Sequence, residues 1–466
     1  MPTPTSTSTS TSTSTFTFLN HAGFLLRTGH ALLLADPWLE GTVLNDAWRL
    51  MDPGTSGAAL IAELNASGLP VFIWCSGAQP DRLSVAFLRR LLGEFRGIAT
   101  WLYLPGRDRR LADTLRRHRC AMLACNEGAA RTLAPDLVLT AYADGDATAS
   151  CLIGCGARNV LALGERALSS STACQAMAER LRRDGARIDL LLTSFADMGW
   201  CGNPDGFAAR EAAAERGIER LAMQAEILRP RLLVPVGAFA RFGRADNAWL
   251  NHGRRSPQGV FDAPRLARQR GILRFLAPGA QCDLALDTAA TLRGHHELAL
   301  AHWLACWQAR PDPLPRPPQA QVAALKDAFL TYRLRAVKRL YGLPRLLERL
   351  HLIRPLVLNF PDLHQSVELS YLAGLRPVGR DAPVDLAMCS GTALYLLRAE
   401  DGYDATVAGG CFWLARASGL SAFGRFFLPQ RMGRRGLDRE RPWEAGKVLL
   451  RAGLGWAVRG LRAGMR

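Results

Sequence analysis

The sequence predicts an α/β fold in which a large layered domain precedes a smaller α+β module. Three observations lead to this prediction. From residue 16 onward, short apolar runs alternate with amphipathic stretches of helical length, a pattern typical of sheets covered by helices. Five of the ten residues from Arg310 to Gln319 are proline, which marks a linker. With 466 residues, the chain is long enough for two or three domains with well-buried cores.

The first 15 residues are almost entirely threonine, serine and proline. Such a low-complexity segment has too few apolar side chains to form a core, so residues 1–15 are predicted to be disordered. Ordered structure is expected from Phe16. Apolar runs at 16–28 and 30–38, joined at Gly29 and His30, predict a β-hairpin that opens a sheet.

Strands and helices then alternate along the first domain, which we assign to residues 16–309. Short runs rich in Val, Ile and Leu predict strands, and apolar residues every three or four positions predict helices. The predicted strands are 69–75, 100–105, 136–143, 150–155, 158–164, 188–196 and 231–237, and the predicted helices are 58–65, 84–95, 111–120, 171–184 and 208–228.

After the linker at 310–319, residues 320–430 predict a smaller α+β module. Val322 to Leu352 has the pattern of one or two amphipathic helices, and apolar runs around EDGYDA predict a hairpin between Val384 and Leu414. The tail at 431–466 alternates arginine with Leu, Trp and Val. We expect this basic amphipathic tail to pack on its own domain, and peripheral contact with a membrane or a protein partner is the alternative.

The formal net charge is +17 and is carried almost wholly by arginine. A charge of this size suits nucleic acid or an anionic membrane surface. The basic residues are spread out and are not interleaved with aromatic residues as in a nucleic-acid platform. Nucleic acid is therefore not expected as a partner.

The eleven cysteines include no C-x-x-C pair, so a zinc ribbon or a thioredoxin-like redox motif is not supported. The amino end lacks the basic and apolar regions of a secretory signal. No apolar run reaches the ~18 residues that a membrane-spanning helix needs. These features predict a cytoplasmic protein.

The first hairpin resembles that of metallo-β-lactamase-fold proteins, most of all the branch that includes CMP-sialic acid hydroxylase and its bacterial relatives. The resemblance rests on His21-Ala22, on Asp36-Pro37-Trp38 and on the Asn-Asp-x-Trp segment at 45–48. Weaker likeness extends through FARFGRADNAWLN (239–251) and the segment 384–413. It implies an αββα metallo-β-lactamase-like sandwich.

In the resembled fold, a His-x-His-x-Asp-His loop between a strand and a helix binds one or two metal ions. Here that loop reads G-A-Q-P-D-R, and the ligand positions hold Gly77, Gln79, Asp81 and Arg82. Glycine has no ligand atom, arginine repels a cation, and glutamine is a poor ligand for transition metals. Only Asp81 matches the motif, so the resemblance implies a degenerate metal site, with Asp81 and Arg82 as the candidate functional residues.

The later ligand positions are also altered. Proteins of the resembled fold have a further histidine ligand in the region where this sequence has only Asp144 and Asp146. The acidic ligand that follows the next strand in that fold corresponds to Glu165. Together with Asp81, these acids define an alternative site for a hard ion such as Mg²⁺.

Other polar residues have structural or binding interpretations. His21 is expected to hold neighbouring backbone through its ring nitrogens, and Asp36 is expected to accept hydrogen bonds from loop amides. The resemblance places the loop Ser194 to Gly206 along the cleft. The candidates for substrate contact are Asp197, Trp200 and Asn203.

Three functional hypotheses follow. The first is a pseudoenzyme without metal or other cofactor, which acts as a scaffold or binds a small anionic ligand beside Arg82. The second is an active metal-dependent hydrolase or oxygenase with a carboxylate-rich site. The third is an arginine-rich protein of membrane surfaces or nucleic acid.

Overall fold

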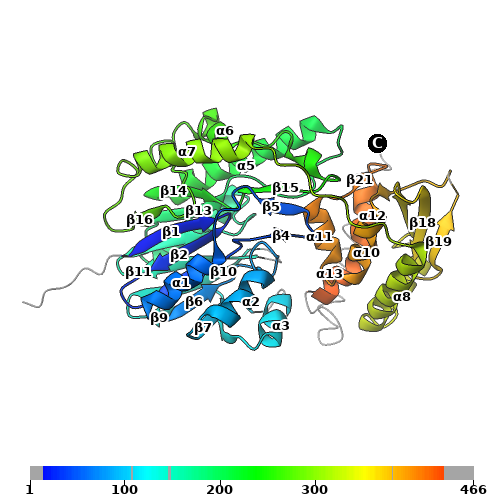
Figure 1. The fold of residues 1–466 in the computed structure, drawn as a ribbon, viewed down its shortest axis with the longest axis horizontal. Helices are drawn as coiled ribbons and strands as arrows, with labels where there is room; N and C mark the ends of the chain where they lie inside the picture. Colours follow the sequence, from blue (N-terminus) through cyan, green and yellow to red (C-terminus); the bar gives the residue numbers. More distant parts are fainter. Residues whose placement is uncertain (1–13, 106–108, 145–147, 380, 435–466) are drawn as a thin grey trace, which may run out of the picture.

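The computed structural model describes residues 14–105, 109–144, 148–379 and 381–434. Figure 1 shows a two-sheet sandwich beside a smaller α+β part. Asp146, nearly all of the predicted disordered tail at 1–15 and most of the basic tail at 431–466 lie outside the described residues.

Two sheets form the sandwich, and each combines antiparallel and parallel pairs. The first sheet has the order β16 (Gln281–Asp283), β1 (Thr15–Asn20), β2 (Gly23–Arg27), β3 (Leu32–Ala35), β6 (Val71–Trp74), β7 (Ala99–Tyr103) and β8 (Ala121–Ala124). The second has the order β14 (Leu232–Val236), β13 (Leu190–Ser194), β12 (Arg158–Ala162), β11 (Thr148–Cys155), β10 (Leu137–Asp144) and β9 (Ala130–Ala134).

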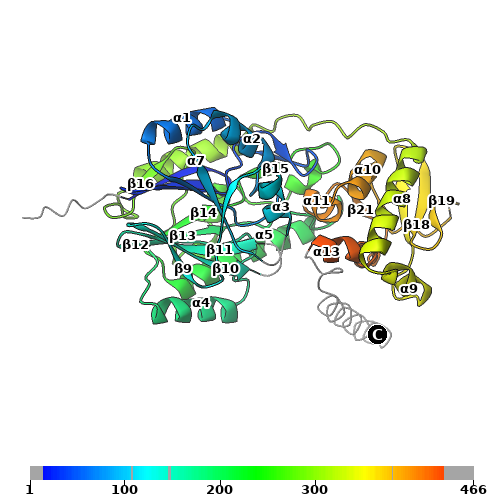
Figure 2. The same cartoon turned by 90° about the horizontal axis from the view of Figure 1, so that it is seen from below.

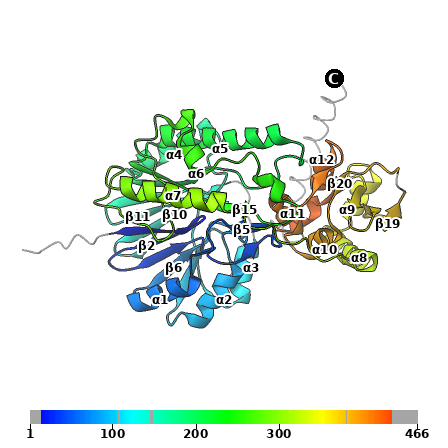
Figure 3. The same cartoon turned by 45° about the horizontal axis from the view of Figure 1, so that its top comes forward.

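Helices cover the outer face of each sheet, which completes the predicted αββα sandwich (Figures 2 and 3). The first sheet carries α1 (Gly57–Ser67), α2 (Val85–Glu94) and α3 (Arg109–Arg117), and the second carries α4 (Ser171–Arg183) and α5 (Phe207–Leu228). Strand β3 shows how the layers arise. Leu32 and Leu34 pack among residues of the helices, whereas Leu33 and Ala35 belong to the core between the sheets, because successive side chains of a strand point to opposite faces.

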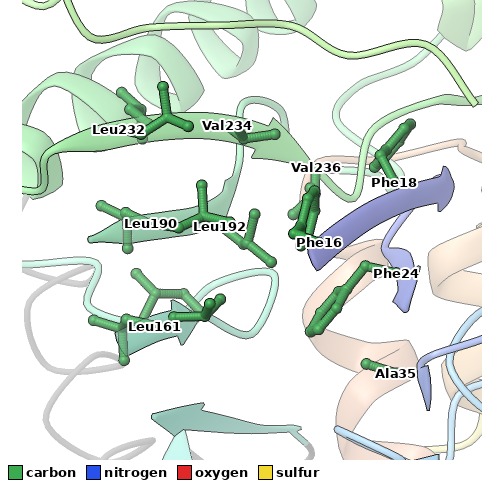
Figure 4. Close-up of a cluster of buried hydrophobic side chains, with 14 of the residues drawn as sticks. Phe16, Phe18, Phe24, Ala35, Leu161, Leu190, Leu192, Leu232, Val234 and Val236 are labelled. Atoms are coloured by element: carbon green, nitrogen blue, oxygen red, sulfur yellow. The ribbon is translucent and has the colours of Figure 1, made fainter. Parts of the chain in front are cut away.

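The core between the sheets is apolar on both sides. Figure 4 shows Phe16, Phe18 and Phe24 of the first sheet opposite aliphatic side chains of β12, β13 and β14. Helix α7 (Arg293–Gln308) extends this core through Trp303, whose ring stacks on Phe239 at 4.1 Å between centroids. Smaller elements complete this part of the chain: β4 (Thr42–Val43), β5 (Trp48–Leu50), β15 (Ala240–Phe242), η1 (Ala248–Asn251), α6 (Pro257–Phe261) and η2 (Pro264–Leu266).

Two predicted elements differ from the structure. The run at 16–28 is two strands, β1 and β2, because the chain turns at His21, whose φ is +47°. The predicted hairpin between Val384 and Leu414 is largely helical instead, with α10 (Ser390–Arg398) and α11 (Gly402–Gly409). Short apolar runs do not distinguish a buried helix from a strand by periodicity alone.

Beyond the proline-rich segment, the chain forms a second core around a five-stranded sheet. The sheet has the order β19 (Gly374–Val378), β18 (Gln365–Ser370), β17 (Leu356–Phe360), β20 (Leu386–Ala387) and β21 (Trp413–Leu414). The other helices here are α8 (Val322–Arg339), α9 (Leu343–Arg349), α12 (Gly419–Phe426) and α13 (Leu428–Arg434). We call residues 320–434 the carboxyl-terminal part. Its limits as a separate module stay a prediction.

A buried polar cluster joins the carboxyl-terminal part to the sandwich. Arg244, 1 % exposed, pairs with Asp246 through Nε at 2.9 Å and donates through Nη2 to the Thr392 hydroxyl at 2.7 Å. The amide of Asn247 donates to the carbonyl of Gly409 at 2.7 Å. Because Thr392 and Gly409 belong to α10 and α11, these bonds hold both helices against the sandwich.

Replacing Arg244 should destabilise the protein strongly. The change Arg244→Ala leaves Asp246 buried without its cation, which costs about 3–5 kcal/mol. Arg255→Ala is the matched control because its pair with Glu215 is 45 % exposed on both sides, and such pairs contribute about 0–1 kcal/mol. Urea denaturation of both variants measures the difference, and equal losses would contradict a structural role for Arg244.

Candidate functional site

The loop that resembles a metal loop lies at the rim of the sandwich. It leaves β6 at Trp74 and ends at Ser84, whose hydroxyl caps α2 by accepting the Phe87 N–H at 3.3 Å. Within the loop, Gly77 forms a β-bridge with Thr148 at the start of β11. The loop therefore spans from the first sheet to the second, between a strand and a helix.

Arg82 lies inside this rim with 4 % of its surface exposed. Its Nε is 3.1 Å from Oδ2 of Asp81, and its Nη1 is 3.4 Å from Oδ2 of Asp36. Gly237 has a φ of +77°, and a Cβ at this position would meet Nη2 of Arg82 at the ordinary contact distance of 3.5 Å. The guanidinium thus bridges two buried carboxylates.

Asp36 accepts a loop amide, as predicted. Its Oδ1 accepts the Ser76 N–H at 2.8 Å, and its Oδ2 accepts the Ser76 hydroxyl at 2.6 Å. Burial raises the pKa of Asp36 despite the opposing charge of Arg82 and the bonds from Ser76. The loop and the end of β3 are therefore fastened together at this carboxylate.

His21 differs from its predicted role. Its ring nitrogens have no hydrogen-bond partner among the described residues. Its backbone carbonyl instead accepts the Gly237 N–H at 2.7 Å. The left-handed turn places the ring edge-on to Trp38, with Nε2 3.6 Å from Asp81, which is an electrostatic contact longer than a hydrogen bond.

The charges of this cluster are set by burial and by the neighbouring groups. Burial lowers the pKa of His21, so the ring is neutral at neutral pH. Burial would raise the pKa of Asp81, but the nearby His21 and Arg82 outweigh it and the pKa is lowered. Asp81 and Arg82 are therefore an ion pair over the physiological range.

The donor set of the loop does not fit a metal ion. Gly77 has no side-chain ligand atom, and the positively charged guanidinium of Arg82 pairs with Asp36 and Asp81, the carboxylates that would bind a cation. Within the described part of the chain, no group of three His, Cys, Asp or Glu side chains converges closely enough to hold a metal. We therefore derive no chemical step through a metal at this loop.

The weaker metal candidates are engaged elsewhere. Asp144 accepts a hydrogen bond from the Ser150 hydroxyl, and burial raises its pKa to about 6. The partly buried Glu165 accepts the Met198 N–H at 2.9 Å, and burial together with the charge of Asp81 raises its pKa. Asp146 lies outside the described residues.

The space beside Arg82 is small. A cavity of about 10 Å³ there is lined in part by Asp36, Trp74, Ser76 and Arg82, which corresponds to roughly one water molecule. Trp38 is fully buried and packs in one cluster with Ala405 of α11. The carboxyl-terminal part therefore helps to close the rim over the loop that resembles a metal loop.

The three predicted substrate-contact residues lie further out. Asp197 accepts a hydrogen bond from Nη1 of Arg220 at 2.6 Å, and the Trp200 ring stacks on Phe412 at 5.4 Å between centroids. The Asn203 amide exchanges two hydrogen bonds with the backbone of Leu414. Asn203 thus faces the carboxyl-terminal part, whereas Asp197 and Trp200 line a cavity of about 360 Å³.

Three arginines that line this cavity were absent from the sequence prediction. Arg166 follows β12, and Arg216 and Arg220 lie on α5. A signal for the last two exists in the sequence, because Ala213, Arg216 and Arg220 occupy one face of a helix at spacings of three and four. Sequence periodicity alone does not tell whether such a face meets solvent or a cavity.

Comparison with known proteins adds solved structures only, since no family model and no curated protein sequence matches the chain. A mutant of the CmlA beta-hydroxylase is 15 % identical and gives a TM-score of 0.40, with 61 % of this chain covering 55 % of that one. The metallo-beta-lactamase fold protein YhfI from Bacillus subtilis is 13 % identical with a TM-score of 0.36, and 58 % of this chain covers 99 % of it. Zn²⁺-bound PqqB from Methylobacterium extorquens is 14 % identical with a TM-score of 0.35, and the match covers 57 % of this chain and 86 % of PqqB. Our fold assignment is based on strand order and layering.

No helix in the described ranges is sufficiently long and apolar to cross a lipid bilayer.

The ion pairs of Arg82 predict a pH-dependent loss of stability on its removal. Arg82→Ala leaves Asp81 and Asp36 buried without a cation, which costs about 3–5 kcal/mol at neutral pH. The lowered pKa of Asp81 contributes stability above the unfolded pKa, and this contribution disappears as the pH falls through the folded pKa. Because burial without Arg82 raises the pKa of both carboxyls, the variant takes up protons at higher pH than wild type, and the difference in stability should shrink as the pH falls from neutral to about 4.

Chemical denaturation across this pH range measures the effect. The exposed Arg89 on α2 provides the control, and Arg89→Ala should change stability by less than about 0.5 kcal/mol. An unchanged stability of Arg82→Ala at neutral pH would contradict the ion-pair role.

Proposed function

We propose that this protein, an αββα sandwich of the metallo-β-lactamase type, is a metal-independent ligand-binding protein. One observation carries the proposal: the guanidinium of Arg82 occupies a ligand position of the resembled metal loop and is paired with Asp81 and Asp36. A metal bound to both carboxylates at about 2.0–2.2 Å would compete with this buried cation for the same oxygens.

The packing around the cluster supports the same proposal. His21, Asp81 and Arg82 are nearly inaccessible to solvent, and the adjacent cavity has room for roughly one water. A hydrolytic or oxidative site needs space for a substrate beside the reactive group. The larger cavity at Asp197 and Trp200 has such space, and it lies apart from the Arg82 ion pairs.

The alternative, a carboxylate site for a hard ion, has less support. It needs Asp81, Asp144 and Glu165 to share one ion, but each has its own partner: Arg82, Ser150 and the backbone of Met198. The fourth acid, Asp146, lies outside the described residues.

Metal analysis tests the proposal. Protein purified without chelator should contain far less than one equivalent of zinc, iron, manganese or magnesium per chain. The variant that combines Gly77→His, Gln79→His and Arg82→His restores the full ligand motif and is the positive control for detection. Stoichiometric metal in the wild type that is lost in Asp81→Ala would overturn the proposal.

A second candidate function is contact with an anionic lipid surface. Four leucines on α8, on α9 and directly after α9 are about half exposed: Leu330, Leu334, Leu346 and Leu350. The same two helices carry only two acids, Asp327 and the buried Glu348. They carry seven basic residues: Lys326, Arg333, Arg335, Lys338, Arg339, Arg345 and Arg349. Exposed apolar side chains on helices rich in cations suit the interface of an anionic membrane.

Vesicle co-sedimentation tests this second candidate. Binding should require phosphatidylglycerol in phosphatidylcholine vesicles and should weaken as salt rises. The double variant Leu346→Ser and Leu350→Ser should lose most of the binding. The control double variant Leu286→Ser and Leu298→Ser removes two exposed leucines elsewhere, at 72 % and 70 % exposure. Equal losses in both, or no binding by wild type, would refute the lipid function.

A further inference from the structure

The cavity of about 360 Å³ beside α5 has the features of an anion-binding site. It lies between the segments that follow β12 and β13 and the face of α5 that carries Ala213, Arg216 and Arg220. Its volume falls within the roughly 300–1,000 Å³ of small-molecule sites. It is separate from the small cavity at Arg82.

Arg220 is the most buried of the three arginines that line this cavity. It is 7 % exposed, and its Nη1 donates to Asp197 at 2.6 Å. Its Nε and Nη2 are buried and have no hydrogen-bond partner among the described residues. These two nitrogens form one edge of the guanidinium, which is the edge that binds two oxygens of one oxyanion in parallel. A buried N–H without an acceptor is costly, so the site favours a ligand with oxygen acceptors.

Neighbouring groups extend this donor set. Trp200 lines the cavity, and its Nε1 is also buried without a partner in the described part of the chain. Arg166 and Arg216 line the same cavity and are themselves exposed. No described acid lies within salt-bridge distance of either guanidinium. Three arginines against one aspartate, Asp197, leave a formal charge of +2 on the lining.

We infer that this cavity binds the phosphate group of a small phosphomonoester, with Arg220 and Trp200 as the buried donors and Arg166 and Arg216 at the entrance. A phosphomonoester carries about −1.5 to −2 charges at pH 7 and three terminal oxygens, which match the charge and donors of the lining better than the single charge of a carboxylate. The cavity leaves room for an organic part beside Met198 and Trp200. This inference rests on the proposed ligand-binding function and gives it a site and a ligand class.

Calorimetric titration of the full chain with phenyl phosphate tests the inference. The protein is first stripped of metal with a chelator and then exchanged into chelator-free buffer, so the result does not depend on the metal analysis. Phenyl phosphate should bind, inorganic phosphate should bind more weakly, and benzoate should bind at least ten times more weakly than phenyl phosphate. No binding of phenyl phosphate, or equal binding of benzoate, would overturn the phosphate assignment.

Variants locate the site. Arg220→Gln removes the buried edge and should weaken phenyl phosphate binding about 10- to 100-fold, as expected for hydrogen bonds to a charged group. Because Arg220→Gln also removes the pair with Asp197, the exposed Arg216→Gln and the ring-preserving Trp200→Phe provide variants that keep the fold, and each should weaken binding several-fold. Arg265→Gln makes the same charge change at a 64 % exposed side chain. Equal affinities of Arg216→Gln, Trp200→Phe and Arg265→Gln would contradict the inference.

Discussion

The pairing of one buried guanidinium with two buried carboxylates is the constraint on which the rim of this sandwich depends. Asp36 follows β3, and Asp81 and Arg82 follow β6. Each of these charges would be costly to bury alone, so the strand ends must bring them together. Ser76 contributes two hydrogen bonds to Asp36, and the N–H of Gly237, directly after β14, donates to the carbonyl of His21. The ends of β3, β6 and β14 are thereby held in one arrangement.

The same constraint links the sandwich to the carboxyl-terminal part. His21 lies between Asp81 and Trp38, and Trp38 packs in the cluster that includes Ala405 of α11. The bonds of Arg244 and Asn247 to α10 and α11 hold this contact from the other side. With the rim filled by side chains, a separate cavity of about 360 Å³ lies outside it, beside α5. The cavity is thus separate from the loop 75–84 that resembles a metal loop.

Much of the fold was predictable because the apolar spacing differs between strands and helices. The apolar runs predicted as a strand at 69–75 and a helix at 84–95 became β6 and α2, and so placed the loop between them correctly. The turn at His21 was not predicted, because a left-handed histidine has no distinctive pattern in sequence. The helices α10 and α11 were also missed, because buried helices and buried strands share the same short apolar runs.

For the candidate site, the sequence by itself determined which atoms are present: it showed that the loop keeps the motif's carboxylate at Asp81 and has Gly77, Gln79 and Arg82 where the resembled fold has histidines. Only the tertiary structure decided what these atoms do. Arg82 could pair with an acid or face a ligand, and the answer depended on Asp36, which is 46 residues away in the chain. Nε and Nη2 of Arg220 and Nε1 of Trp200 likewise have no hydrogen-bond partner among the described residues because of how α5 and the loop after β13 pack. Residue identity determines charge and hydrogen-bonding capacity, whereas burial and pairing arise from contacts between segments distant in sequence.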